Sequence, residues 1–136
     1  MYETFDHTAD LGLRIRASNL DELFSEAGRA LFAVLVDDLE TVESQQRIEI
    51  KIKSADQTYL LFDWLNELLY RFETEQLLFG QFKVAVEGNR LEGSAWGENL
   101  DRARHELMHE VKAITYHRLR VEQTPAGWQA EVIVDI

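Results

Sequence analysis

The chain has 136 residues, and its 14 lysine and arginine residues against 25 aspartate and glutamate residues give a formal net charge of −11. This length fits one domain over residues 1–136. Hydrophobic residues make up 46% of the chain, which excludes general disorder and is typical of a packed globular protein. The absence of cysteine excludes disulfides, thiolate metal sites and a cysteine nucleophile.

The acidic balance limits the partners of the protein. Phosphate backbones are bound mainly through lysine and arginine, so we expect no strong direct binding of nucleic acid; if RNA is involved, another protein holds it. No apolar run is long enough to span a membrane, and the first residues do not form a signal peptide. We therefore expect a cytoplasmic protein without membrane contact. The sequence leaves the oligomeric state open.

The first half of the chain predicts two strands and a helix. A short strand is expected over residues 2–6, and apolar residues alternate with polar ones over 11–17 as in a half-buried strand. Asn19 and Glu22 have the spacing of a capping box, followed by apolar residues on one helical face. This helix should end near Val36.

A third strand and a second helix follow. Residues 48–53 alternate clearly, after which Ser54 or Asp56 can cap a helix. The buried stripe of that helix is expected to consist of Leu61, Trp64, Leu65, Leu68, Leu69 and Phe72. Its other face carries Asp63, Asn66, Glu67 and Tyr70, for which a solvated surface is the favoured interpretation and a partner surface the alternative.

The second half of the chain is dominated by hairpins. Residues 82–86 alternate, and Gly88-Asn89 supplies the positive φ angles of a two-residue turn. A further alternating strand is predicted over 111–121, with a turn at 124–127 and a return strand over 128–134. The fold class is therefore α+β: an antiparallel β-sheet with hairpins and two main α-helices packed on it.

One pattern formally suggests zinc chemistry. His105, Glu106 and His109 match H-E-x-x-H, in which two histidines one helical turn apart bind zinc and the glutamate acts as general base. Apolar residues over 100–108 allow a short helix there. A zinc hydrolase also needs a third ligand, however, and the strand beginning at Val111 follows immediately. A solvated helix end is the favoured interpretation, and a zinc hydrolase the alternative.

The two ends of the chain carry oxygen donors. Asp6, Thr8 and Asp10 stand between the first two predicted strands, where such residues usually hold a turn. Asp135 and Ile136 close the last strand, and together with the terminal carboxylate they supply hard oxygen ligands of the kind that Ca²⁺, Mg²⁺ or Mn²⁺ prefers. The alternative for the C-terminus is an exposed strand end.

The position of Lys112 relative to Asp135 is left open by the pattern. If the last hairpin pairs Gln123 with Trp128, Asp135 faces Tyr116, and Lys112 lies about 13 Å further along at 3.3 Å per residue. A lysine side chain cannot span that distance alone. Either a bulge shifts the register or the two residues converge through a third element.

Taken together, these motifs resemble the archease family. The resemblance extends in order over nearly the whole chain and is specific only as a set. It rests on residues 5–12 (FDHTADLG), 63–70 (DWLNELLY), 97–98 (GE), 104–105 (RH), 110–117 (EVKAITYH) and 134–136 (VDI).

The resemblance implies a function in RNA ligation. Archeases are small acidic cofactor proteins of the RtcB-type RNA ligase, which joins a 2′,3′-cyclic phosphate or 3′-phosphate end to a 5′-hydroxyl in tRNA splicing and RNA repair. By this resemblance the chain is not an enzyme but an activator, which promotes guanylylation of the ligase histidine by GTP and enables multiple turnover. A general chaperone or RNA-modification accessory module is the alternative.

The resemblance also assigns residues. The family binds a divalent cation, calcium, through positions that correspond here to Asp10 and Asp135, with Ile136 contributing backbone oxygen; Mg²⁺ or Mn²⁺ remain alternatives. Lys112 corresponds to a third residue that the family needs for activation. His109 lies in a stretch that varies in the family, which weakens the zinc hypothesis further. The accessory-module alternative predicts no dependence on Asp10 or Asp135.

Overall fold

The fold is described from a computed structural model, which describes residues 1–7 and 10–136 and only the main chain of His7. The structure confirms the strands expected over 2–6, 11–17 and 48–53, and each observed strand end lies within two residues of the expected one. Both expected helices are also confirmed. In chain order the elements are β1 (Tyr2–His7), β2 (Asp10–Ala17), α1 (Leu20–Leu35), the 3₁₀ turn η1 (Leu39–Thr41), β3 (Gln46–Lys53), α2 (Gln57–Glu75), β4 (Leu77–Glu87), β5 (Arg90–Asn99), β6 (Ala113–Ile114), β7 (Arg120–Thr124) and β8 (Gly127–Asp135).

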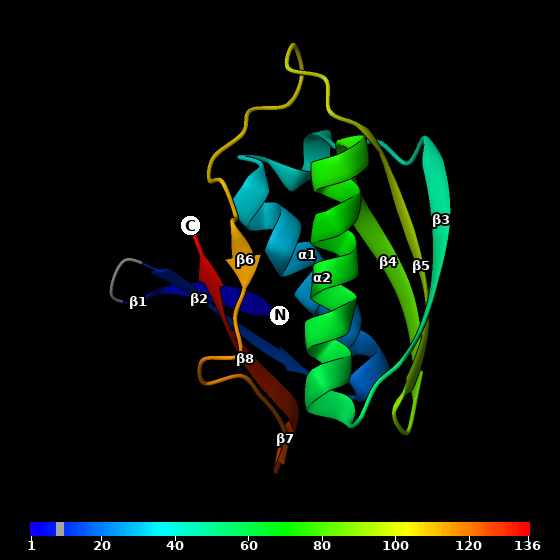
Figure 1. Cartoon of the computed structure of the whole chain (residues 1–136), viewed down its shortest axis with the longest axis vertical. Helices are drawn as coiled ribbons and strands as arrows, with labels where there is room; N and C mark the ends of the chain where they lie inside the picture. Colours follow the sequence, from blue (N-terminus) through cyan, green and yellow to red (C-terminus); the bar gives the residue numbers. More distant parts are fainter. Residues whose placement is uncertain (8–9) are drawn as a thin grey trace.

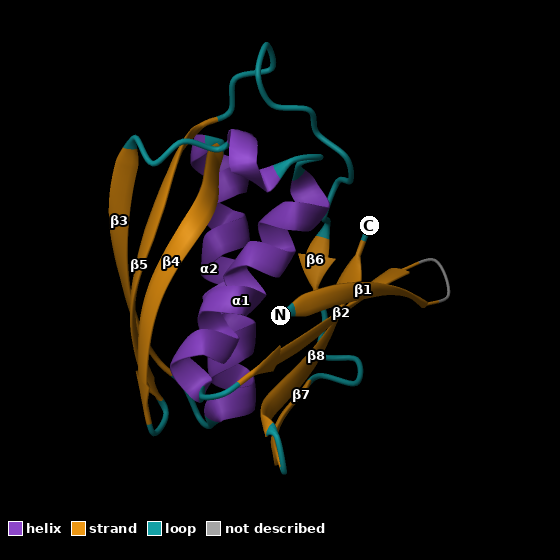
Figure 2. Cartoon of the chain, turned by 180° about the vertical axis from the view of Figure 1, so that it is seen from behind, coloured by secondary structure: helices purple, strands orange, loops and turns teal. Residues whose placement is uncertain are grey.

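Two antiparallel sheets enclose the helices. In the described residues the first sheet has the strand order β1-β2-β8-β6, with β7 also paired to β8, and the second has the order β3-β5-β4. Figures 1 and 2 show α1 and α2 as a middle layer between the sheets. The predicted α+β class with antiparallel hairpins is confirmed, but the strands form two sheets rather than one. The reason lies in α1, which buries Ala30 and Phe32 in addition to its expected stripe and so needs cover on more than one side.

Both helices begin at the predicted caps. The Asn19 side chain accepts a hydrogen bond from the Glu22 amide at 2.9 Å, and Asp56 accepts one from the Tyr59 amide at 2.9 Å. Ser54, the other candidate cap, instead donates its hydroxyl to a carboxylate of α2. Within the described residues neither helix is long and apolar enough to cross a membrane.

The helices are joined to each other through a buried tryptophan. Trp64 of α2 is fully buried, and its indole N–H donates to the Phe24 carbonyl of α1 at 3.0 Å. Burying an indole while satisfying its donor is the favourable arrangement for this side chain. The core of the protein therefore lies around α1, with one face of α2 and the inner faces of both sheets against it.

Two expectations for the second half are wrong. The apolar residues over 100–108 form a turn and irregular chain instead of a helix, and the strand expected over 111–121 is divided into β6 and β7. Residues 115–119 between them leave the ladder, and Arg118 takes a positive φ of 56° there. The Thr115 hydroxyl, which donates to the Ile133 carbonyl at 2.8 Å, marks the point of departure.

Candidate functional site

The two aspartates predicted at opposite ends of the chain lie directly opposite each other. Asp10 at the start of β2 pairs with Asp135 at the end of β8. Side chains of directly opposed residues project from the same face, with Cβ atoms about 4.5–5.5 Å apart. Both residues are half-buried. The antiparallel pairing of β2 with β8 thus brings two carboxylates from remote parts of the sequence into one site.

The row of residues that lie opposite one another across the strands continues on both sides of this aspartate pair. On one side Asp10 pairs with the main chain of His7 in β1; on the other, Asp135 pairs with Ala113 in β6. Thr8 and Ala9, which complete the N-terminal motif and for which a turn was expected, lie outside the described residues. The site is therefore formed by four strand positions at one end of the first sheet.

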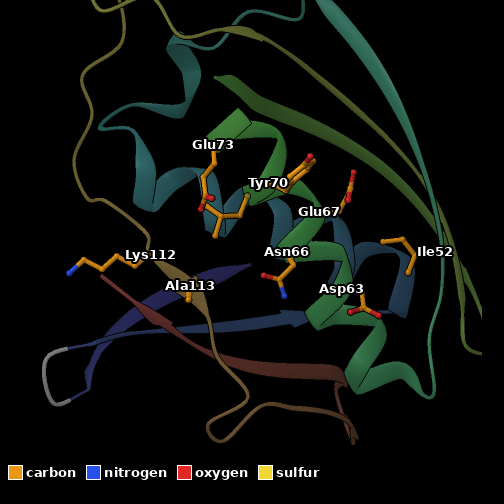
Figure 3. A pocket seen from close by; sticks show the side chains of 9 residues that line it. Ile52, Asp63, Asn66, Glu67, Tyr70, Glu73, Lys112 and Ala113 are labelled. Carbon is orange, nitrogen blue, oxygen red and sulfur yellow. The ribbon is translucent and has the colours of Figure 1, made fainter. Parts of the chain in front are cut away.

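Lys112 adjoins this row through its main chain. Its amide donates to the Asp135 carbonyl at 2.7 Å. Its side chain is exposed and, as Figure 3 shows, points away from α2. Over the part of the chain that the structure describes, neither the Lys112 ammonium nor the Asp135 carboxylate forms an ion pair within 4 Å. Both charges are thus available to a ligand or partner.

A change of register explains how Lys112 reaches Asp135. The predicted pairing of Gln123 with Trp128 is confirmed. Ala113 rather than Tyr116 nevertheless faces Asp135, a difference of three residues. Residues 115–119 absorb this difference by leaving the ladder. The register shift, one of the two explanations that the sequence left open, therefore occurs, and it brings the main chain of Lys112 rather than its ammonium to Asp135.

A groove runs along α2 beside the site. It has a volume of about 560 Å³ and extends from β3 to the segment that carries Lys112. The surface predicted from the second helix, including a 58% exposed Tyr70, lines it. The lining residues are Ile52, Asp63, Asn66, Glu67, Leu69, Tyr70, Glu73, Lys112 and Ala113. The polar face of α2 therefore forms one wall of this groove.

A buried ionic cluster stands at the end of β5. Glu98 is 6% exposed, and its carboxylate accepts hydrogen bonds from the Arg104 guanidinium, from His105 Nε2 at 3.0 Å and from the Glu43 amide at 2.7 Å. Burial raises the pKa of Glu98, but the hydrogen bonds from Arg104, Glu43 and His105 outweigh it and hold the pKa below its ordinary value. Hydrogen bonding to Glu98 in turn raises the pKa of Arg104. Glu98 is therefore ionised in the folded protein.

The cluster also shows why the H-E-x-x-H pattern does not form a zinc site. The Asp101 amide donates to His105 Nδ1 at 2.9 Å, so both ring nitrogens of this buried histidine are occupied within the protein. His109 is exposed and lies in irregular chain, so the two histidines do not share a helical face. In the described residues no three histidine, aspartate or glutamate side chains are grouped to hold a metal. The geometry contradicts a zinc site at His105, Glu106 and His109.

The cluster is the part of the site region that motif reasoning did not find. Glu98 and Arg104 contributed only to the family resemblance, without a role, and His105 was otherwise considered only as a zinc ligand. Charged side chains are rarely buried, so sequence alone gives no reason to place a glutamate in the interior. The nearest signal was the presence of an acidic, a basic and an imidazole group within a few residues of one another.

These features define a small α+β protein in which two helices lie between antiparallel sheets and the pairing of β2 with β8 places two aspartates opposite each other. A family model described as the archease protein family (MTH1598/TM1083) matches residues 2–136. Two curated proteins named Protein archease, from Pyrococcus furiosus and Methanopyrus kandleri, are 41% and 40% identical to this chain. The alignments cover 99% of this chain and 98% and 99% of those proteins. The chain belongs to the archease family.

Solved structures agree with this membership. The solution structure of Methanobacterium thermoautotrophicum protein 1598 is 38% identical, with a TM-score of 0.88 over 99% of this chain and 98% of that chain. A Thermotoga maritima protein described as an archease, possible chaperone, is 22% identical, with a TM-score of 0.70 over 100% of this chain and 98% of that chain, and supports the fold alone. These descriptions name no enzymatic reaction.

Proposed function

We propose that this protein activates an RtcB-type RNA ligase by promoting guanylylation of the ligase histidine with GTP and so enabling repeated turnover. The observation that carries the proposal is the meeting of Asp10, Asp135 and Lys112 at one end of the first sheet. These are the three residues for which the family resemblance implies an essential role, and Lys112 contacts Asp135 through its main-chain amide. Their convergence from distant parts of the sequence supports a common function.

The chemistry of the carboxylate pair fits a divalent cation. Like charges placed directly opposite each other on neighbouring strands repel, and a bound cation removes that repulsion. Asp10 and Asp135, with main-chain or terminal oxygen of Ile136, would hold Ca²⁺, Mg²⁺ or Mn²⁺ through hard oxygen donors. Two side chains do not fill the coordination shell of such an ion, so further oxygen ligands come from water or from the partner. When bound, the ion supplies positive charge that polarises a phosphoryl oxygen.

Lys112 adds a mobile positive charge beside the pair. Its exposed ammonium stands on a flexible stem, while its amide is fixed on the Asp135 carbonyl. Such a group stabilises negative charge that develops on a phosphate brought to the site. In this proposal Lys112 acts on the nucleotide or RNA end held by the ligase.

The charge of the whole protein suits such a partner. A ligase that binds GTP and RNA has a basic cleft, and a protein of net charge −11 is attracted to that cleft by long-range electrostatics. The ligase therefore holds the RNA, and this chain contributes an acidic surface with one lysine at its site.

A turnover assay tests the proposal. An RtcB-type ligase in limiting amount is mixed with labelled GTP, Mn²⁺ and RNA ends, with and without this protein, and ligations per ligase molecule are counted. We expect multiple turnovers only with the protein present. Asp10→Ala and Asp135→Ala should reduce turnover to the level without protein. Glu92→Ala, on the exposed outer face of the second sheet, is the matched control and should activate normally.

The other outcomes are equally informative. No effect on a cognate ligase would contradict activation and favour the chaperone or accessory-module alternative. Full stimulation by Asp135→Ala, with an unchanged melting temperature, would contradict the assignment of the site.

A further inference from the structure

The segment that carries Lys112 has little regular structure of its own. Residues 100–112, here called the strap, run from the end of β5 to the start of β6, and Figure 1 shows them arching past the ends of the helices. Within the described residues the strap makes a single β-type contact, the bridge between Leu107 and Val36. A long irregular segment has many conformations, so its position depends on discrete anchors.

The buried cluster is the first anchor. Arg104 and His105 reach back from the strap to Glu98 in β5, and the Asp101 amide closes the turn on His105. The Arg104 guanidinium also donates to the Thr41 carbonyl at 3.3 Å. An ionised carboxylate in the interior requires these donors, because a buried charge without partners is strongly unfavourable. The cluster therefore holds the first part of the strap in one conformation.

The second anchor is the C-terminal end of α1. The Met108 and His109 amides donate to the Leu35 and Val34 carbonyls at 2.9 and 3.3 Å. Carbonyls in the last turn of a helix have no partner within the helix, and the strap supplies one. Only residues 110 and 111 remain between this anchor and Lys112.

We propose that Arg104 and His105, through Glu98, are positioning residues for Lys112. Fixing the first part of the strap determines which strap amides bind the last carbonyls of α1, namely those of Met108 and His109. With these two amides in place, the Lys112 amide lies within hydrogen-bonding distance of the Asp135 carbonyl. Arg104 itself does not touch the carboxylate pair. This inference rests on the proposed function, because it gives Lys112 the role assigned there.

Amide hydrogen exchange tests the positioning without any ligase. In Arg104→Ala, the Met108, His109 and Lys112 amides should exchange about tenfold or more faster, because the strap opens locally, while core amides of β2 and β8 keep their protection. Arg102→Ala is the matched control, since Arg102 is an exposed strap residue with no ion pair in the described part of the chain. If Arg104→Ala does not fold, Arg104→Lys is measured instead. Unchanged exchange at Lys112 would overturn the proposal.

A double-mutant cycle in the ligase assay separates positioning from general stability. Arg104→Ala should lower maximal ligase turnover about fivefold or more, and adding it to Lys112→Ala should cause no further loss, because both changes act through one side chain. Additive losses would overturn the proposal. If Lys112→Ala alone leaves turnover unchanged, the proposed function of Lys112 is wrong, whereas the exchange experiment still reports whether the cluster holds the strap.

Discussion

Ala113 lies directly opposite Asp135, in a register three residues away from the one that pairs β7 with β8. Residues 115–119, which leave the ladder, are packed against α2 through Tyr116. Tyr116 stacks on Phe62 of α2 with ring centroids 3.9 Å apart and an interplanar angle of 17°. The loop that permits Lys112 to reach Asp135 is thus itself held against the helix.

Replacing Lys112 by alanine separates function from stability. The side chain is exposed, and the hydrogen bond from the main-chain N–H to the Asp135 carbonyl does not need it, so we expect the free energy of unfolding to change by less than about 0.5 kcal/mol. Ligase turnover should fall several-fold but stay measurably above the level without activator. Urea unfolding and the turnover assay measure the two quantities. Lys83→Ala, an exposed lysine on β4, is the control; equal turnover for the two variants would contradict the prediction.

Asp135→Asn should stabilise the metal-free protein and abolish its response to metal. Removing one of two opposed like charges is expected to raise the free energy of unfolding by about 0.2–1 kcal/mol in chelator. For the unchanged protein, a cation at 100 times its Kd adds about 2.7 kcal/mol.

The comparison is made by urea unfolding with chelator and with Ca²⁺, Mg²⁺ or Mn²⁺ in turn. Glu92→Gln serves as the control because it removes a carboxylate from the other sheet. Equal stabilisation of Asp135→Asn and the unchanged protein by every cation would show that Asp135 is not a ligand.

Most local elements could be predicted because the strands have a two-residue periodicity and the two helices have a capping residue as well as an apolar stripe. Asn19 and Asp56 are found where the patterns place them, and Gly88 turns the β4–β5 hairpin with a φ of 60°. The break between β6 and β7 could not be predicted. The alternation of apolar and polar residues continues through the whole segment 111–121 and gives no sign of a break. The positive φ falls on Arg118, a residue type that gives no turn signal.

The site was predictable only in part, for the same reason. Residue chemistry pointed to the carboxylates of Asp10 and Asp135, but only the pairing of β2 with β8 brings them together. Long-range register depends on tertiary packing and has no local signature. The buried Glu98 was unpredictable because its donors, Arg104 and His105, lie in chain without regular structure.

The two histidines of the H-E-x-x-H pattern should behave differently. His105→Ala leaves the buried Glu98 carboxylate short of one donor, and we expect a loss of about 1–3 kcal/mol in unfolding free energy. His109→Ala changes an exposed side chain and should cost less than about 0.5 kcal/mol. Urea unfolding and elemental analysis test this together. One bound zinc per chain, lost in both variants, would revive the zinc hypothesis.

The stability of the protein should fall in acid partly through Glu98. Its pKa in the folded protein lies below the ordinary value of 4.5, so between these two values the unfolded chain binds more protons than the folded one. The free energy of unfolding contributed by Glu98 is therefore fully present above about pH 4.5 and is lost as the pH falls through the lower folded-state pKa. Glu98→Gln should be less stable than the unchanged protein at pH 7, and the gap should narrow below pH 4.5. Urea unfolding across this pH range measures the difference in free energy of unfolding. Glu92→Gln is the exposed control, and it should leave the fall in stability below pH 4.5 unchanged. A gap that stays constant with pH would mean that the Glu98 charge does not contribute to stability.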